Sequence, residues 1–308
     1  MTEQIRVHDA HQLRRRVLEE AERAVLLGVY ADGSDDLHAA FLARSGPRVL
    51  STRFDPTRPL EAWSNALPML SWDEREIVDE LGGVLTNLAD PRPFRLSEGL
   101  MPCARTAQGA GVMHVVVGPV HAGIIEPGRF TFSSAGESVA ALDAQLGYAY
   151  RGIEAACASR DPIAVARLVA RVCGGCSAAR SYAYARAIES AAATVIAPQV
   201  DLARLIFAEL ERAYNHLADL AACASGAGWV PGFVRGMNAK EEAMRLCAIA
   251  SGHRLLFDAI VPGGVCAGAF ADRDAFTGAL DAFAEGVQSY LEALFENRSV
   301  RSRWAGAG

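Results

Sequence analysis

The spacing of apolar residues is mixed in the first hundred residues of the chain and helical in most of the rest. Over residues 9–23, Leu13, Val17 and Ala21 recur at helical spacing, which predicts a helix. Short apolar runs separated by Asp-Gly and Ser-Gly turn sequences follow, and they predict strands. The predicted strands are residues 24–31, 37–44 and 47–54. A second helix is predicted over residues 73–81, with Gly82 ending it.

The middle of the chain combines a proline-rich stretch with short apolar runs. Residues 88–102 contain several prolines, which predicts a linker. Residues 114–117 and 129–133 are apolar or β-branched and predict strands. From about residue 138 onward the pattern predicts helices throughout.

The helical part has clear start signals. Asp161-Pro162 is typical of a helix start, because Asp caps the first turn and Pro suits its first position. Pro198 begins the strongest helical pattern of the chain. Two further helices are predicted over residues 239–257 and 272–296.

These elements together predict an α+β protein. An N-terminal α/β domain over residues 1–100 precedes a mainly helical bundle over residues 101–308. A small β element stands at the entrance of the bundle. No internal repeat is evident in the sequence.

Composition narrows the class of protein. Hydrophobic residues make up 51% of the chain, which excludes a disordered protein. The net charge of −6 argues against a nucleic-acid-binding surface. We expect no membrane span, because no run of about eighteen apolar residues occurs. Seven cysteines and no evident secretory signal are typical of free thiols in a reducing cytoplasm.

The strongest chemical signal is the sequence Cys173-Gly174-Gly175-Cys176. Two thiols three residues apart, before a predicted helix, can hold a metal or perform redox chemistry. The positive end of that helix is expected to favour the thiolate form. Four interpretations are open: inert core thiols, half of a zinc site, a thiol–disulfide pair, or two ligands of a metal centre completed from elsewhere. The remaining helical cysteines are interpreted as core residues: Cys223, Cys247 and Cys266.

The residues around this pair resemble a known family. Residues 171–185 resemble the first cysteine motif of the large subunit of nickel–iron hydrogenases, most closely the energy-converting, membrane-associated group 4 type. That group is related to the quinone-binding large subunit of respiratory complex I. Further motifs in the same order carry the resemblance: residues 118–121, 126–130, 147–154, 209–217, 251–254 and 262–265. Residues 72–79 resemble the small complex I subunit, which implies that its α/β domain is fused in front.

The resemblance implies a role for five residues. Cys173 and Cys176 would be nickel ligands, one of them bridging to iron. Glu126 would relay protons, and His121 would approach a quinone headgroup. Arg180 stands where the family has a histidine, so it can donate a hydrogen bond to a thiolate but cannot shuttle a proton at neutral pH. Glu126 and His121 also have a non-functional interpretation. Glu126 would then be a carboxylate in a surface turn, and His121 a loop histidine without a partner.

The resemblance also implies an assembly. Electrons would pass between a 4Fe–4S cluster in a small iron–sulfur partner subunit and a buried nickel–iron or quinone site. Proton-translocating membrane subunits would hold the chain peripherally on the inner face of the cell membrane. No nucleic acid would take part.

The departures from the family pattern open alternatives. The second cysteine pair of the hydrogenases is absent, so we expect a truncated product, a split gene or a lost site. A nickel-free, quinone-reacting subunit and a degenerate structural subunit without activity of its own are the alternatives.

Polar residues on the helices have simpler interpretations. Arg151 and Glu154 are expected to form a helical ion pair. Glu209, Arg212 and His216 are expected to form a buried hydrogen-bond network.

Overall fold

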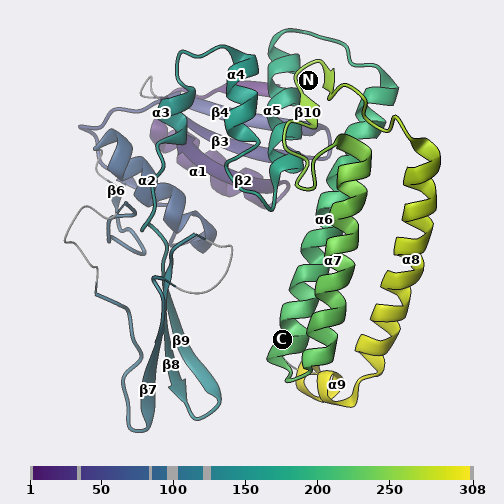
Figure 1. The fold of residues 1–308 in the computed structure, drawn as a ribbon. Coiled ribbons are helices and arrows are strands. Elements are labelled where there is room, and N and C mark those ends of the chain that lie inside the picture. The colour runs from purple at the N-terminus through teal and green to yellow at the C-terminus, as the bar shows by residue number, and fades with distance from the viewer. Residues whose placement is uncertain (1–2, 33–35, 83–84, 96–102, 121–125, 306–308) are drawn as a thin grey trace. The chain divides into compact units, whose positions relative to one another are not determined.

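The computed structural model describes residues 3–32, 36–82, 85–95, 103–120 and 126–305 (Figure 1). The predicted α+β class is confirmed, with most strands in the first half of the chain and a helical second half. Contacts divide the chain into two compact units, Met1–Arg151 and Gly152–Gly308. The domain boundary predicted at residue 100 lies inside the first unit and remains a prediction that rests on the resemblance.

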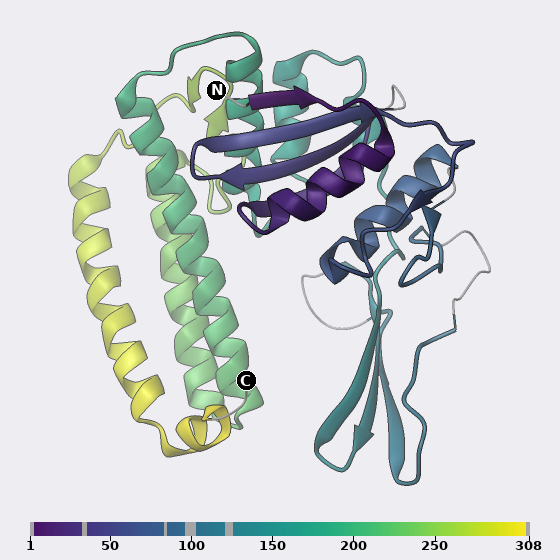
Figure 2. The same ribbon diagram turned by 180° about the vertical axis from the view of Figure 1, so that it is seen from behind.

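The first unit is built on a four-stranded sheet that helices cover on one face. In pairing order the strands are β1 (Glu3–Arg6), β4 (Gly46–Arg53), β3 (Asp36–Ala43) and β2 (Val25–Ala31). β1 is parallel to β4, and the other pairs are antiparallel. Figure 2 shows α1 (Ala10–Ala21) lying across this sheet. Its residues Leu13 and Val17 join the core with Phe41 and Leu50. The three predicted strands and the first predicted helix are therefore confirmed.

Local signals set the ends of the helices in this unit. The Asp9 carboxylate caps α1 by accepting a hydrogen bond of 2.8 Å from the Gln12 N–H. Helix α2 (Ser71–Leu81) packs on β2 and follows the short 3-10 helix η1 (Pro68–Leu70). It ends at Gly82, whose φ of 61° lies in the left-handed region. The predicted helix end at Gly82 is confirmed. A short parallel pair, β5 (Leu60–Glu61) and β6 (Leu85–Thr86), completes this part.

A second sheet in the first unit corrects one prediction. It is an antiparallel meander of β7 (Val112–Val117), β8 (Arg129–Ala135) and β9 (Ser138–Gln145). The sequence predicts helix from residue 138, but residues 138–145 form a strand. Gly136, at a φ of 63°, makes a tight turn that pairs Ala135 with Ser138. Strand pairing with β8 therefore overrides the helical propensity of this alanine-containing segment.

The described end of the proline-rich stretch is also more ordered than a linker. Asp90 and Arg92 are buried or nearly so and bond to Arg75 of α2 and Asp143 of β9. These four residues are called the arginine–aspartate cluster below. It holds the polar face of the second sheet, on which Ser133 is also buried.

The second unit is helical. Its helices are α3 (Ile153–Cys157), α4 (Pro162–Val169), α5 (Ser177–Ala191), α6 (Pro198–Gly226), α7 (Val230–Ser251), α8 (Arg273–Glu296) and α9 (Arg298–Trp304). A small antiparallel pair, β10 (Ile260–Val261) and β11 (Gly264–Val265), lies between α7 and α8. The predicted starts at Pro162 and Pro198 and the predicted helix over 272–296 are confirmed. The helix predicted over 239–257 instead begins at Val230 and ends at Ser251.

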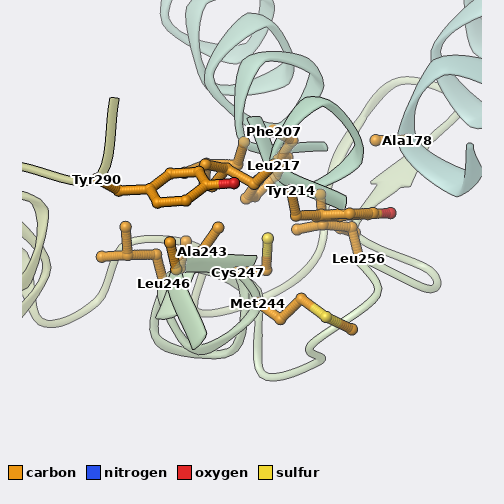
Figure 3. Packing of buried hydrophobic residues seen from close by; sticks show 14 of the residues in the cluster. Ala178, Phe207, Tyr214, Leu217, Ala243, Met244, Leu246, Cys247, Leu256 and Tyr290 are labelled. Atoms are coloured by element: carbon orange, nitrogen blue, oxygen red, sulfur yellow. The ribbon is translucent and has the colours of Figure 1, made fainter. Parts of the chain in front are cut away.

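Close packing of α6 on α7 forms the core of this unit (Figure 1). An added Cβ at Gly236 would lie 2.8 Å from the Cβ of Ala221 and 2.6 Å from the Tyr290 hydroxyl. The absence of a side chain at Gly236 therefore lets the two helices approach closely. Figure 3 shows Tyr214 and Cys247 inside this core. Among the residues that the structure describes, no helix is long and apolar enough to cross a membrane.

Candidate functional site

Residues 171–176, called the thiol loop here, connect α4 to α5. Cys173 lies in the loop, and Cys176 is the N-cap residue of α5. The Cys176 N–H donates to the Cys173 carbonyl at 3.3 Å, which closes a turn between the two thiols. Both side chains are half-buried. Local geometry therefore keeps the two sulfurs on one side of the loop, as their spacing predicts.

Helix α6 holds the backbone of the thiol loop. The Tyr214 hydroxyl donates to the carbonyls of Gly174 and Gly175 at 3.3 and 3.4 Å. The Asn215 side-chain amide also donates to the Gly175 carbonyl. An added Cβ at Gly175 would lie 3.3 Å from the Asn215 oxygen and 3.8 Å from the Cys173 sulfur. The glycines therefore admit the α6 side chains and leave the thiols uncrowded.

A second clamp holds the start of the loop. Arg171 forms a bidentate ion pair with Asp258, at 2.8 and 2.6 Å, and its guanidinium lies 5.0 Å from the ring centre of Phe257. Leu256 and Asp258 have φ values of 57° and 61°, in a region that non-glycine residues seldom adopt. The backbone of residues 256–258 is therefore strained, and in this conformation Phe257 and Asp258 both contact Arg171.

The buried residue Glu211 contacts the first turn of α5, directly after the thiol loop, and the sequence did not predict this role. It accepts hydrogen bonds from the N–H groups of Ala178 and Ala179, at 2.6 and 2.9 Å. It therefore caps the N-terminus of α5 from the neighbouring helix α6. Burial raises the pKa of Glu211, although the backbone hydrogen bonds act in the opposite direction. Its helical spacing with Tyr214 and Asn215 is a sequence signal that places all three on one face of α6.

The prediction that the α5 N-terminus favours a Cys176 thiolate is wrong. Burial and a hydrogen bond with Cys173 raise the pKa of Cys176, and the Arg180 hydrogen bond only partly offsets this. Glu211 occupies the first free amides of α5 and adds a negative charge beside the loop. Arg180 does donate its Nε–H to the Cys176 sulfur at 3.3 Å, the contact expected from its position.

The other predicted site residues lie in the first unit. Glu126 follows β7 in sequence, is exposed, and pairs with Arg151 at 3.1 Å. The predicted ion pair of Arg151 with Glu154 is therefore wrong, because Arg151 precedes the first turn of α3 and points its guanidinium at Glu126. His121 lies outside the described residues.

The predicted buried network on α6 is also wrong. Glu209 and Arg212 pair with each other at 3.1 Å and are both 61% exposed, and His216 is exposed. The buried ion pair of α6 is instead Arg204 with Glu189 of α5, at 2.6 Å. Arg204 also donates to the Val261 and Gly264 carbonyls, so it ties the β10–β11 pair to the bundle.

The three cysteines predicted in the core have different surroundings. Cys247 is buried, and burial raises its pKa to about 12. Cys266 is half-buried, and its sulfur donates to the Ser251 carbonyl. Cys223 is exposed, so its predicted core position is wrong.

The described residues supply an incomplete ligand set for a metal. No group of three or more His, Cys, Asp or Glu side chains gathers at one point among them. Cys173 and Cys176 alone provide two soft ligands, whereas a closed metal site in a protein takes about four. The described residues therefore supply at most two of the ligands that such a site needs, and no catalytic step through a metal follows from them.

The helical unit and its thiol loop define the class to which the chain is related. Residues 151–220 match the nickel-dependent hydrogenase family. The chain is 31% identical over 148 residues to the alpha subunit of the membrane-bound hydrogenase of Pyrococcus furiosus, covering 48% of this chain and 35% of that protein. It is 27% identical to an NADH-quinone oxidoreductase subunit of Desulfitobacterium hafniense, covering 61% and 50%. The resemblance predicted from the motifs is confirmed: the chain is homologous to both kinds of subunit.

A solved structure supports the fold. A chain of the membrane-bound sulfane sulfur reductase, an archaeal respiratory membrane complex, superposes with a TM-score of 0.57 at 20% identity, covering 64% of this chain and 53% of that one. The chain thus spans between about a third and a half of the length of the proteins that it resembles.

Proposed function

We propose that this chain is a subunit of a membrane-associated respiratory complex, in which its thiol loop supplies two ligands to a redox centre. The observation that carries the proposal is the double clamp on the loop. Side chains of α6 hold the Gly174 and Gly175 carbonyls, and Asp258 holds Arg171. The clamps bond to backbone or to Arg171, so neither clamp uses a sulfur of the loop. A loop that holds both thiols in place before a metal binds is suited to supply two of the ligands of a soft metal.

The proposed complex is of the hydrogenase or NADH:quinone type. Cys173 and Cys176 would hold a nickel–iron centre, which would supply electron exchange with a 4Fe–4S cluster of a small iron–sulfur subunit. The remaining ligands would come from outside the described residues. Glu126 would hold a transferable proton, with Arg151 orienting its carboxylate at 3.1 Å. Arg180 would donate its hydrogen bond to the metal-bound Cys176 sulfur, where a fixed positive charge stabilises a thiolate.

Metal analysis of the native complex tests this proposal. The complex is isolated through a tag on this chain, and its nickel, iron and subunit composition are measured. We expect nickel equimolar with the chain, and we expect its loss in Cys173→Ser and Cys176→Ser with the subunits retained. Cys223→Ser is the matched control, because Cys223 is an exposed cysteine of the same unit. Complete complex with iron but without nickel would overturn the nickel–iron assignment.

A nickel-free, quinone-reacting subunit is the second candidate. It is favoured by the raised pKa of Cys176, because burial and the hydrogen bond with Cys173 favour the neutral thiol over the thiolate that a metal needs. Its relatives in NADH-quinone oxidoreductases support it. In this case His121→Ala would abolish quinone reduction by the complex, whereas Cys173→Ser would leave it unchanged. The opposite pattern would exclude this candidate.

A further inference from the structure

Helix α8 has an apolar stripe that the described residues leave largely open. Leu280, Ala284, Leu291 and Phe295 follow one another along its length and line an open groove of about 700 Å³. Phe276, Tyr290 and Leu294 are buried on an adjacent face of the same helix. The core packing of α8 is therefore centred on that adjacent face, although Leu291 also packs against the core and Phe295 contacts Trp304. Figure 1 shows α8 beside α7 and on the outer side of the bundle.

The stripe has the dimensions of a helix-packing surface. Leu280 and Phe295 are fifteen positions apart, which corresponds to about 22 Å along the helix axis. The intervals of four, seven and four residues between its members keep them on one side of the helix. A long, narrow apolar stripe of this kind fits a second helix laid along it better than a loop or a single side chain.

One flank of the stripe is acidic. The carboxylates lie roughly 90° around the helix from the stripe, because each residue advances the helix by about 100°. They are Asp274, Asp281, Glu285, Glu292 and Glu296. None of the five forms an ion pair with any residue that the structure describes, whereas α8 itself has only Arg273 as a basic residue.

We propose that α8 is a docking surface for an amphipathic helix of a partner protein, with apolar residues in the groove and Lys or Arg along the α8 flank. The negative charge of the flank favours a basic partner helix over a second copy of this chain or an anionic membrane. A second copy packed on α8 would bring the two acidic flanks together, which is unfavourable. An anionic membrane surface would be repelled for the same reason. A basic flank would instead meet five unpaired carboxylates.

Binding of designed probes to the full-length chain tests the docking surface. The first probe is a fluorescent helical peptide of about 21 residues with a leucine stripe and a Lys/Arg flank. The second is the same peptide with Glu in place of each Lys and Arg. We expect fluorescence anisotropy to show at least about tenfold tighter binding of the basic peptide. Equal affinity of the two peptides, or no binding of either, would overturn the proposal.

Two variants locate the binding. Glu285→Lys with Glu292→Lys is expected to invert the preference between the probes, because both residues are exposed on the flank. The control is Glu19→Lys with Glu22→Lys on and just after α1, which changes the net charge equally at exposed positions of the first unit. An equal loss of the basic probe in the control would mean attraction by net charge alone, and the proposal would fail.

A cross-linking experiment identifies the natural occupant in the assembled complex. A photoreactive amino acid replaces Leu291, or Glu19 as the control, and the cross-linked peptides are sequenced by mass spectrometry. A basic amphipathic segment of another subunit, cross-linked from position 291 and not from position 19, is the expected result. A cross-link from position 291 to a second copy of this chain or to lipid would contradict it.

Discussion

Two sites of the molecule, one in each unit, bury charged side chains and bond them to different kinds of partner. In the arginine–aspartate cluster of the first unit, Arg92 forms ion pairs with two carboxylates, Asp90 at 2.6 Å and Asp143 at 2.8 Å. Beside the thiol loop, the buried Glu211 bonds to two backbone amides. The first arrangement joins a segment to a sheet, and the second sets the shape of a loop. Only the second leaves the neighbouring side chains, the thiols, available for chemistry.

A substitution in the arginine–aspartate cluster should lower the free energy of unfolding more than a substitution at Glu211. Arg92→Met would leave the buried carboxylate of Asp143 without its cation. We expect the free energy of unfolding of this unit to fall by about 3–5 kcal/mol, the usual cost of breaking a buried ion pair. Urea unfolding followed by the fluorescence of buried Trp63 measures it, in a background where Trp72, Trp229 and Trp304 are replaced by Phe. Arg16→Met, at an exposed position of α1, should change stability by less than about 0.5 kcal/mol.

The cap on α5 should have an intermediate effect. Glu211→Ala leaves the N–H groups of Ala178 and Ala179 without acceptors, which costs about 1–3 kcal/mol. Hydrogen exchange of these two amides should accelerate, while the rest of α5 keeps its protection. The control is Glu209→Ala, because Glu209 is exposed on the same helix. Unchanged exchange in Glu211→Ala would show that the carboxylate does not hold the loop.

The two regions should respond to pH with opposite sign. Burial acts to raise the pKa of Asp143, but the hydrogen bonds and charge of Arg92 outweigh it and hold the pKa below 3.8. The contribution of Asp143 to stability is therefore full above that value and is lost as the pH falls through the lowered pKa. The pKa of Glu211 is raised above 4.5, so its contribution is largest in acid and declines as the pH rises through the raised pKa.

Replacing each carboxylate by its amide measures the pH dependence of stability that each residue causes. The difference in free energy of unfolding between the wild type and Asp143→Asn should increase from about pH 3 to pH 5. The difference between the wild type and Glu211→Gln should decrease from about pH 4.5 upward. Parallel slopes for the two variants would remove the distinction between the regions.

The smallest expected effect is a change in the reactivity of the Cys176 thiol. Arg180→Ala removes the hydrogen bond that lowers the pKa of Cys176. Alkylation of Cys176 by iodoacetamide at neutral pH should slow by less than about tenfold, because one hydrogen bond shifts the pKa by less than a unit. Quantitative mass spectrometry of the Cys176 peptide measures the rate. Arg186→Ala on the same helix should leave it unchanged, and an equal effect there would assign the change to general charge.

Elements with strong local signals were predictable from the sequence. The start of α6 at Pro198 and the cap of α4 at Asp161 follow from residues adjacent to each helix. The strand over residues 138–145 was not predictable in this way, because its conformation depends on pairing with β8. The site shows the same division. The spacing of Cys173 and Cys176 identifies the loop, but the partners of Arg171 and of Glu211 are distant in sequence.

The sequence by itself determined the class of relatives, the helical nature of the second unit and the pair of thiols before one of its helices. It could do so because motif residues and helical periodicity are local properties of the chain. Only the tertiary structure decided the protonation tendency of Cys176, because that tendency depends first on how deeply packing buries the thiol. It also decided which residue caps α5, since Glu211 reaches the α5 N-terminus from thirty-three positions away. Electrostatic effects act through space, so the residue that controls a site need not be adjacent to it in the chain.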